Sequence, residues 1–191
     1  MLTSRGNQMS EEVLIRHCSP TLAGMKTGNL FSVAYTDEKE LRDELRAFNR
    51  RFVSKGLRIV PLRRRENRAL LYLYRPKKLA DDLQEPSARK VLKDHGYSPE
   101  CPARCVTNLR QRLCSNADFP HEVGLFLGYP PEDVCGFIAL GAANCKCVGC
   151  WKVYGDEAAA KKTFAKYKKC TAVYCSQWAN GTSIERLIVA D

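Results

Sequence analysis

Long apolar runs are missing from this chain of 191 residues. No stretch approaches the roughly 20 consecutive apolar residues of a transmembrane helix, so the sequence predicts no membrane partner. The beginning of the chain also lacks the apolar segment of a secretory signal. We interpret residues 1–8 as a disordered extension ahead of Met9, and we expect a cytoplasmic protein.

Histidine and the common catalytic signatures are scarce as well. The chain has three histidines and contains neither a His-x-x-x-His pair nor a Gly-x-Ser-x-Gly segment. A histidine-dominated metal site is therefore disfavoured. Low-complexity linkers and internal repeats are absent too. Because 45% of the residues are hydrophobic, we expect one α+β domain over residues 9–191.

Cysteine and positive charge, by contrast, are abundant. Ten cysteines in a chain without an export signal are expected to be free thiols, because cytosolic reductants keep disulfides open. The net charge of +10 attracts anions such as nucleic acids, phosphorylated cofactors and acidic proteins. Since the charges are spread along the chain, solubility alone is the alternative explanation.

The hydrophobic pattern predicts a β-α-β-β order followed by helices. Strands are expected at residues 30–35, 57–62 and 69–74. A right-handed crossover would make the first two parallel, within a small mixed sheet that residues 148–154 could join as a fourth strand. A helix capped by Ser10 precedes the first strand. The helix between the first two strands begins at Asp37 and has one apolar face: Leu41, Leu45, Phe48 and Phe52.

Prolines and a late capping residue mark the remaining helices. Proline favours the first turn of a helix because its missing N–H has no partner there. We therefore expect helices to start at Pro76, Pro86, Pro99 and Pro130, and another to follow Asp156.

Five cysteines cluster near the C-terminus: Cys145, Cys147, Cys150, Cys170 and Cys175. Thiolates are soft ligands, and short spacings let one loop present several of them to one ion. Four of the five could hold zinc or an iron–sulfur cluster. The alternative is a set of thiols with no cofactor, because Cys147 and Cys150 would point to opposite faces of a strand.

The polar segment that includes Cys18 is a second candidate site. A cysteine beside cationic groups can act as a nucleophile, so Cys18 and Lys26 are candidate catalytic residues. Backbone N–H groups together with Lys26 could cradle a phosphate or a flavin-type anion. The alternative is a structural loop that enters the first strand, with Cys18 packed inside. The predicted ligand-binding residues here are His17, Ser19, Thr21 and Asn29.

A third candidate site surrounds His121. A histidine beside a carboxylate suits acid–base chemistry, so His121 is a candidate catalytic residue, with Glu122 and Tyr129 as ligand contacts. Neighbours on a helix diverge by about 100°, however, so Glu122 could instead complement a helix dipole. We expect the Cys18 segment and the His121 helix to form one functional cleft.

Two basic segments suggest contact with nucleic acid. A strand turn carries Arg63, Arg64, Arg65 and Arg68, and a helix over Lys161–Lys169 presents Lys162, Lys166 and Lys169. Both shapes can contact a phosphate backbone. Aromatic residues that stack bases are sparse here, and no helix-turn-helix or RNA-recognition signature is present. Solvated surfaces are the alternative.

Three segments carry a resemblance to a known family: HCSPTLAGMKTGNLF (17–31), FPHEVGLFLGYPPEDV (119–134) and GCWKVY (149–154). Together they resemble the bacterial domain-of-unknown-function family 3793, which is common in anaerobic bacteria. The resemblance implies a redox or iron-related context and no particular reaction.

These observations lead to one functional hypothesis and two alternatives. We expect an accessory factor of anaerobic redox or iron metabolism that acts through thiols, either with a metal or by docking an acidic flavoprotein such as a flavodoxin on its basic surface. The first alternative is a nucleic-acid-binding module that uses the Arg63–Arg68 turn and the Lys161–Lys169 helix. The second is an enzyme that uses Cys18 or His121 on a phosphorylated substrate.

Overall fold

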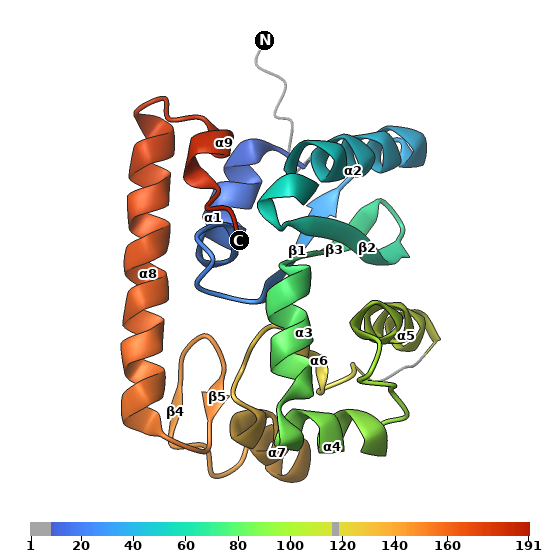
Figure 1. Ribbon diagram of the computed structural model, residues 1–191, viewed down its shortest axis with the longest axis vertical. Helices are drawn as coiled ribbons and strands as arrows, with labels where there is room; N and C mark the ends of the chain where they lie inside the picture. Colours follow the sequence, from blue (N-terminus) through green and yellow to red (C-terminus); the bar gives the residue numbers. More distant parts are fainter. Residues whose placement is uncertain (1–8, 116–118) are drawn as a thin grey trace.

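The computed structural model describes residues 9–115 and 119–191 (Figure 1). The extension expected at residues 1–8 lies outside the described residues. None of the described helices combines the length and the apolar character that crossing a membrane requires.

The first helix is longer than the sequence suggested. Helix α1 (Glu11–Leu22) begins where predicted, with the hydroxyl of Ser10 accepting a hydrogen bond from the Val13 N–H at 3.3 Å. It then continues through residues 17–22, for which a structural loop was the alternative to a candidate site. Pro20 lies inside the helix, and the hydroxyl of Ser19 donates to the Ile15 carbonyl. Burial of residues 18–22 outweighs the cost of the proline.

The sheet has three strands: β1 (Gly28–Ala34), β2 (Arg58–Arg65) and β3 (Arg68–Tyr74). Their order is β1-β3-β2, and both neighbouring pairs are antiparallel. The α+β class is confirmed. β1 and β2 run in the same direction, as predicted, but they are not neighbours, so the expectation of a mixed sheet was wrong. A short turn joins β2 to β3, and β3 is then the strand that pairs with β1.

Helix α2 (Glu38–Phe52) confirms its predicted cap and its buried face. The carboxylate of Asp37 accepts a hydrogen bond from the Lys39 N–H at 2.7 Å, and Leu41, Leu45 and Phe48 are buried in the core. The helix passes into a 3₁₀ turn (Val53–Lys55) before β2. Figure 1 shows α2 above the sheet and α5 below it.

Between the sheet and the C-terminal hairpin, the described residues form α3 (Pro76–Gln84), α4 (Pro86–Asp94), α5 (Pro102–Ser115), α6 (Val123–Phe126) and α7 (Pro131–Leu140). The predicted starts at Pro76 and Pro86 are confirmed, and Pro130 is the N-cap of α7. The start predicted at Pro99 was wrong, because α5 begins at Pro102. These helices cover the sheet face from which Tyr72 and Tyr74 project, opposite the face of α1 and α2.

The C-terminal third contains a separate hairpin and a long helix. Residues 148–154 do not form a fourth strand, because the chain turns at residues 149–151. The result is a two-stranded hairpin of β4 (Cys147–Val148) and β5 (Lys152–Val153). Helix α8 (Glu157–Ala179) then packs along α1, and the short α9 (Ile184–Leu187) precedes the C-terminal residues (Figure 1).

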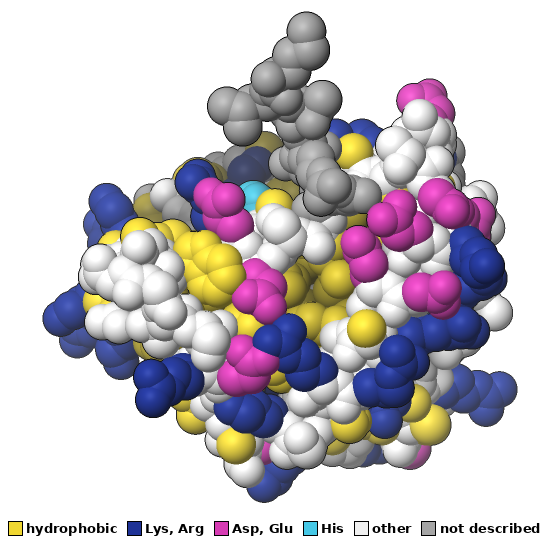
Figure 2. All heavy atoms as spheres, turned by 90° about the horizontal axis from the view of Figure 1, so that it is seen from above, with side chains coloured by type: hydrophobic (Ala, Val, Ile, Leu, Met, Phe, Trp, Pro, Cys, Tyr) yellow, Lys and Arg dark blue, Asp and Glu magenta, His cyan; other side chains and the backbone are white. Residues whose placement is uncertain are grey.

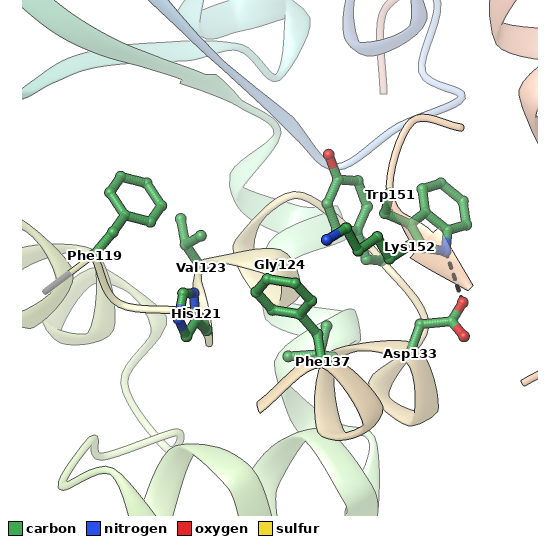
Figure 3. A pocket seen from close by; sticks show the side chains of 10 residues that line it. Phe119, His121, Val123, Gly124, Asp133, Phe137, Trp151 and Lys152 are labelled. Carbon is green, nitrogen blue, oxygen red and sulfur yellow. Dashed lines mark hydrogen bonds between the residues drawn. The ribbon is translucent and has the colours of Figure 1, made fainter. Parts of the chain in front are cut away.

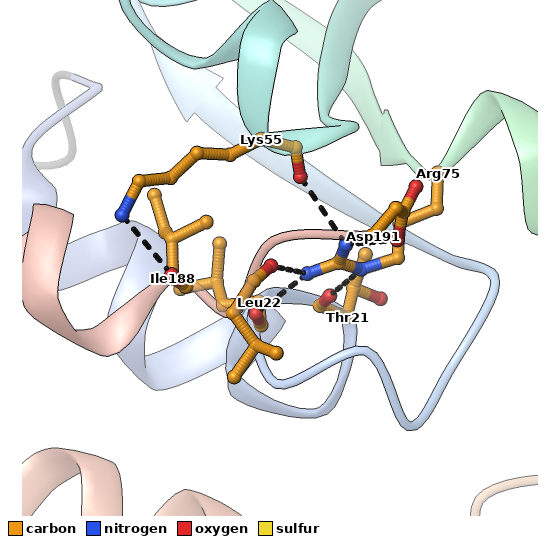
Figure 4. Close-up of polar contacts among 7 residues, drawn as sticks. Thr21, Leu22, Lys55, Arg75, Ile188 and Asp191 are labelled. Carbon is orange, nitrogen blue, oxygen red and sulfur yellow. Dashed lines mark hydrogen bonds and ion pairs between the residues drawn. The ribbon is translucent and has the colours of Figure 1, made fainter.

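Arg75 ties the C-terminal residues to α1 and the sheet (Figure 4). Its buried guanidinium donates to the carbonyls of Thr21 at 2.7 Å, Leu22 at 2.8 Å and Val189 at 2.7 Å, and it pairs with the Asp191 carboxylate. Because the guanidinium bridges chain segments that are distant in sequence, it fixes the packing of α1 against the end of the chain.

The end of the molecule formed by α2 and the first turn of α1 carries charges of both signs (Figure 2). Acidic and basic side chains are interspersed there around a hydrophobic hollow, and Arg51 pairs with Glu11 at 3.0 Å. This end of the molecule is therefore neither uniformly positive nor uniformly negative.

Candidate functional site

A cleft of about 490 Å³ lies where α1, the start of β1, the hairpin loop and α8 meet. Its volume is in the range of small-molecule sites. We call it the Lys26 cleft. No aspartate or glutamate is present among its described lining residues, which include His17, Lys26, Asn29, Cys150, Tyr167 and Lys168.

The turn after α1 holds Lys26 in place. Gly24 adopts a left-handed conformation with φ of 72°, which ends the helix. The N–H groups of Met25 and Lys26 then both donate to the Pro20 carbonyl, at 2.9 and 3.0 Å. The chain enters β1 two residues later. The backbone around Lys26 is thereby fixed between a helix end and a strand.

The Lys26 side chain is only 6% exposed. Its ammonium lies 5.2 Å from the centroid of the Tyr129 ring, within the range of a cation–π contact. Within residues 9–115 and 119–191, the ammonium makes no hydrogen bond or ion pair. Lysine is rarely buried without a partner, so this group is exceptional.

Burial lowers the pKa of Lys26 to about 8, because the charged form is desolvated, while the nearby Cys150 and Cys18 act in the opposite direction. At neutral pH the amine is still mainly protonated. The cleft therefore contains a positive charge that lacks a counter-ion in the described chain.

Cys150 and Tyr167 also line the cleft, and Tyr129 contacts both Lys26 and Cys150. Partial burial raises the pKa of Cys150, and Lys26 partly opposes this, so the group is a thiol at neutral pH. The hydroxyl of Tyr129 donates to the Cys150 carbonyl at 3.1 Å and holds the hairpin loop against the cleft. Burial raises the pKa of Tyr129 and of Tyr167 to about 12, so both stay protonated.

The structure divides the residues predicted around Cys18 into two groups. His17, Lys26 and Asn29 line the cleft, and the Thr21 hydroxyl donates to Oδ1 of Asn29 at 2.7 Å. Ser19 and Cys18 instead face the core, and burial raises the pKa of the Cys18 thiol. The environment of Cys18 is that of a packed thiol, which is the alternative the sequence had left open.

The late cysteines do not converge. Among residues 9–115 and 119–191, no group of three or more His, Cys, Asp or Glu is arranged to hold a metal ion, so the zinc or iron–sulfur site predicted from five cysteines is not assembled. Cys147 packs beside Trp151, Cys150 lines the Lys26 cleft, and Cys175 packs against the core beside α1. The hairpin turn and the position of α8 separate these sulfurs. Of the other two cysteines in this set, Cys145 is half-buried and Cys170 is buried.

His121 and Glu122 also point in different directions. His121 is exposed, whereas Glu122 is buried, accepting a hydrogen bond from the Tyr97 hydroxyl at 2.9 Å and pairing with Arg112 at 2.8 Å. His121 lies in a second pocket, which Tyr129 also lines. The single cleft predicted from the sequence is therefore two separate pockets. Tyr129 lines the second pocket and contacts Lys26 of the first.

The two basic segments lie on opposite sides of the molecule (Figure 1). The turn between β2 and β3 carries the predicted arginines, of which Arg64 pairs with Glu38 at 2.9 Å and Arg68 donates to Ser32 at 3.3 Å. The exposed lysines of α8 are on the other side. One continuous basic surface is therefore not formed by these two segments.

Sequence reasoning missed part of the cleft wall. Phe164, Tyr167 and Thr171 line the cleft from α8, and Lys168 lies beside them. The signal was present, because Phe164, Tyr167 and Thr171 recur at helical spacing and share a face, but such a stripe is also typical of core packing.

Comparison with known proteins identifies the family. A family model described as "Protein of unknown function (DUF3793)" matches residues 14–188. The protein belongs to this family. No curated protein and no solved structure matches the chain significantly. Since the description of the DUF3793 family gives no activity, the function has to be argued from the geometry of the cleft.

Proposed function

We propose that this DUF3793 protein binds a small phosphate-bearing molecule in the Lys26 cleft. The observation that carries the proposal is the Lys26 ammonium, 6% exposed and without an ionic partner in the described chain, on a cleft of about 490 Å³. A desolvated charge without a partner is unfavourable, and an anion in the cleft would compensate it.

The Asn29 side chain supports the proposal that the ligand is an anion with several oxygen atoms, such as phosphate. Its Oδ1 accepts the hydroxyl hydrogen of Thr21, so the orientation of the amide is set by that bond. The Nδ2 group makes no hydrogen bond within the described residues and lies on a side chain that lines the cleft. An N–H donor beside an ammonium is a combination that suits phosphate oxygens.

The outer part of the cleft suits the rest of such a molecule. His17 and Lys168 are exposed and add polar groups at the cleft, while Phe164 and Tyr167 supply aromatic surface from α8. A phosphate near Lys26, with an organic group packed against these rings, would contact both the polar and the aromatic parts of the cleft wall. The Cys150 thiol is the group in the cleft through which the hypothesised thiol-dependent redox role would act.

A thermal-shift measurement with pyrophosphate tests the proposal, at constant ionic strength maintained with sodium chloride. Ligands that bind only the native state raise its melting temperature. We expect pyrophosphate to stabilise the wild type, K26M to lose most of this shift, and K162M to retain it. K162M is the matched control because Lys162 is exposed on α8 and does not line the cleft. An equal shift in all three proteins, or no shift in the wild type, would contradict the proposal.

An acidic protein partner is a second candidate, favoured by a separate observation on α8. Lys162, Lys166, Lys168 and Lys169 are exposed and form no ion pair in the part of the chain that the structure describes, whereas Lys161 pairs with Glu157. Such a surface suits electrostatic docking of an acidic redox protein such as a flavodoxin. Binding to a flavodoxin that weakens with salt and is lost in K166E/K169E would support docking, and binding that is insensitive to both would exclude it.

A further inference from the structure

A second pocket, of about 400 Å³, lies between the segment before α6, helix α7 and strand β5 (Figure 3). Its described lining residues are all different from those of the Lys26 cleft. Tyr129, which lines this pocket, contacts Lys26 through its ring. In Figure 3, Phe119 and His121 lie on one side of the pocket, and Phe137, Lys152 and Trp151 lie on the other. We call it the His121 pocket.

Aromatic rings form half of its described lining residues: Phe119, His121, Tyr129, Phe137 and Trp151. The Tyr129 and Trp151 rings stack with their centroids 4.8 Å apart, and His121 meets Phe137 edge to face at the same separation. Phe119 is 43% exposed, which is high for a large aromatic side chain beside a concavity. Walls of this kind favour a flat aromatic group, which can stack on one ring and meet the edge of another.

The pocket contains one basic and one acidic side chain among its described lining residues that differ in whether they already have partners, Lys152 and Asp133. Lys152 lies over the Phe137 ring at 5.3 Å and makes no ion pair within residues 9–115 and 119–191. Asp133 is the single carboxylate among the described lining residues, and it is 3% exposed. Its oxygens accept hydrogen bonds from the Trp151 Nε1–H at 2.6 Å, the Tyr154 N–H at 2.7 Å and the Gly155 N–H at 2.8 Å. It is therefore already satisfied by donors of the hairpin.

We propose that the His121 pocket binds a planar aromatic carboxylate. The ring lies among Phe119, Phe137 and Trp151, the carboxylate pairs with Lys152, and His121 contributes a ring N–H. A neutral aromatic molecule would leave Lys152 without a partner, and an aromatic cation would be repelled by it. This site is separate from the Lys26 cleft, so either proposal can fail without the other.

Three naphthalene probes of similar shape test the charge preference: 2-naphthoate, 2-naphthamide and 2-naphthylmethylamine. Isothermal titration of the whole protein gives each affinity. A charge-assisted contact contributes about 1.5–3 kcal/mol, so we expect 2-naphthoate to bind about 10-fold or more tightly than the amide. The amine should bind most weakly. Equal affinities for all three, or no binding of 2-naphthoate, would overturn the proposal.

Matched variants test the roles of Lys152 and His121 in binding the carboxylate. K152M should weaken 2-naphthoate binding about 10-fold and leave 2-naphthamide binding nearly unchanged. K166M removes the same charge from an exposed position of α8 outside the pocket and should change neither affinity. H121F keeps an aromatic edge against Phe137 but removes the ring N–H, so it should reduce naphthoate affinity more than naphthamide affinity, because a carboxylate is the stronger acceptor. If K152M and K166M behave alike, Lys152 does not select the carboxylate and the proposal is wrong.

Discussion

The Lys26 ammonium lies 5.2 Å from the centroid of the Tyr129 ring, and this contact links the two pockets. The same ring stacks on Trp151 in the His121 pocket, and its hydroxyl holds the Cys150 carbonyl beside the Lys26 cleft. The hairpin loop between β4 and β5 therefore supplies one residue to each pocket, Cys150 to the cleft and Trp151 to the other.

Removing the buried charge should stabilise the protein. The pKa of Lys26 is lowered from 10.5 to about 8, so between these values the unfolded state binds more protons than the folded state. Stability then rises with pH through this window, and the charge is most unfavourable below about pH 8. K26M should be more stable than the wild type near neutral pH, by on the order of 3 kcal/mol. That difference should shrink by on the order of 2 kcal/mol towards pH 10.

Urea unfolding of both proteins across this pH range measures the effect, with K162M as the control for an exposed lysine. A difference between K26M and wild type that does not vary with pH would mean that Lys26 titrates normally.

Native alkylation should separate the cysteines by exposure. We expect iodoacetamide, followed by peptide mass spectrometry, to modify Cys101 and Cys150 readily and to leave Cys18 unmodified, because Cys18 is completely buried and Cys101 and Cys150 are exposed. Since Lys26 partly opposes the rise that burial causes in the pKa of Cys150, K26M should raise this pKa further, slow alkylation of Cys150 by roughly two-fold and leave Cys101 unaffected. Rapid modification of Cys18 in the folded protein would restore it as a candidate nucleophile.

Loss of Arg75 should destabilise the fold strongly. R75M leaves the buried carbonyls of Thr21 and Leu22 without their donors, so we expect a loss of about 3 kcal/mol or more in urea unfolding. D191N keeps those donors and removes only the carboxylate charge, so its cost should be about 1 kcal/mol. If the two variants cost the same, the backbone contacts of Arg75 contribute little.

Purification without oxygen should give a protein that has no stoichiometric zinc or iron. The cysteine sulfurs of the described chain are not gathered around one ion, so a chelator should leave the melting temperature unchanged. Elemental analysis of the protein and a melting curve with chelator check this. One equivalent of bound metal, lost together with stability on chelation, would show that the thiols rearrange to bind it.

The two basic segments should contribute independently to retention on nucleic acid. Because they lie on opposite sides of the molecule, neutralising Arg63 and Arg65 should leave the contribution of the α8 lysines intact, and the two losses should add. Retention on double-stranded DNA at increasing salt measures both contributions. Complete loss of retention in R63Q/R65Q alone would favour the nucleic-acid-binding alternative through the β2–β3 turn.

The sequence was most informative where one local rule decided the structure. The spacing of Leu41, Leu45 and Phe48 specified the buried face of α2, and Asp37 and Asp156 capped the helices assigned to them. Residues 17–22 misled because a proline and small polar residues usually indicate a loop, whereas here tertiary burial of Cys18 and Leu22 keeps them helical. The position of β3 between β1 and β2 depends on pairing between distant strands, which local patterns do not contain.

The candidate site, too, was predictable where its residues are close in sequence and not where they are distant. Lys26, His17 and Asn29 were found because they lie within one short polar segment. Their combination with Cys150 and Tyr167 was not predictable, because those residues come from a hairpin and a helix more than 100 positions later in the sequence. The close spacing of Cys145, Cys147 and Cys150 suggested a metal site. Cys147, however, lies in β4 and packs in the cluster around Trp151, whereas Cys150 lies in the following turn and lines the Lys26 cleft.

The pH dependence of sulfate affinity tests the central claim most directly. Sulfate imitates phosphate but does not itself titrate near or above neutral pH, so a change in its affinity reports on the protein. With a Lys26 pKa of about 8, isothermal titration should show wild-type affinity falling by roughly 30-fold between about pH 7 and pH 9.5, in step with the protonated fraction, and weak, pH-independent binding in K26M. Equal affinity at both pH values in the wild type, or wild-type affinity in K26M, would contradict an anion site built on Lys26.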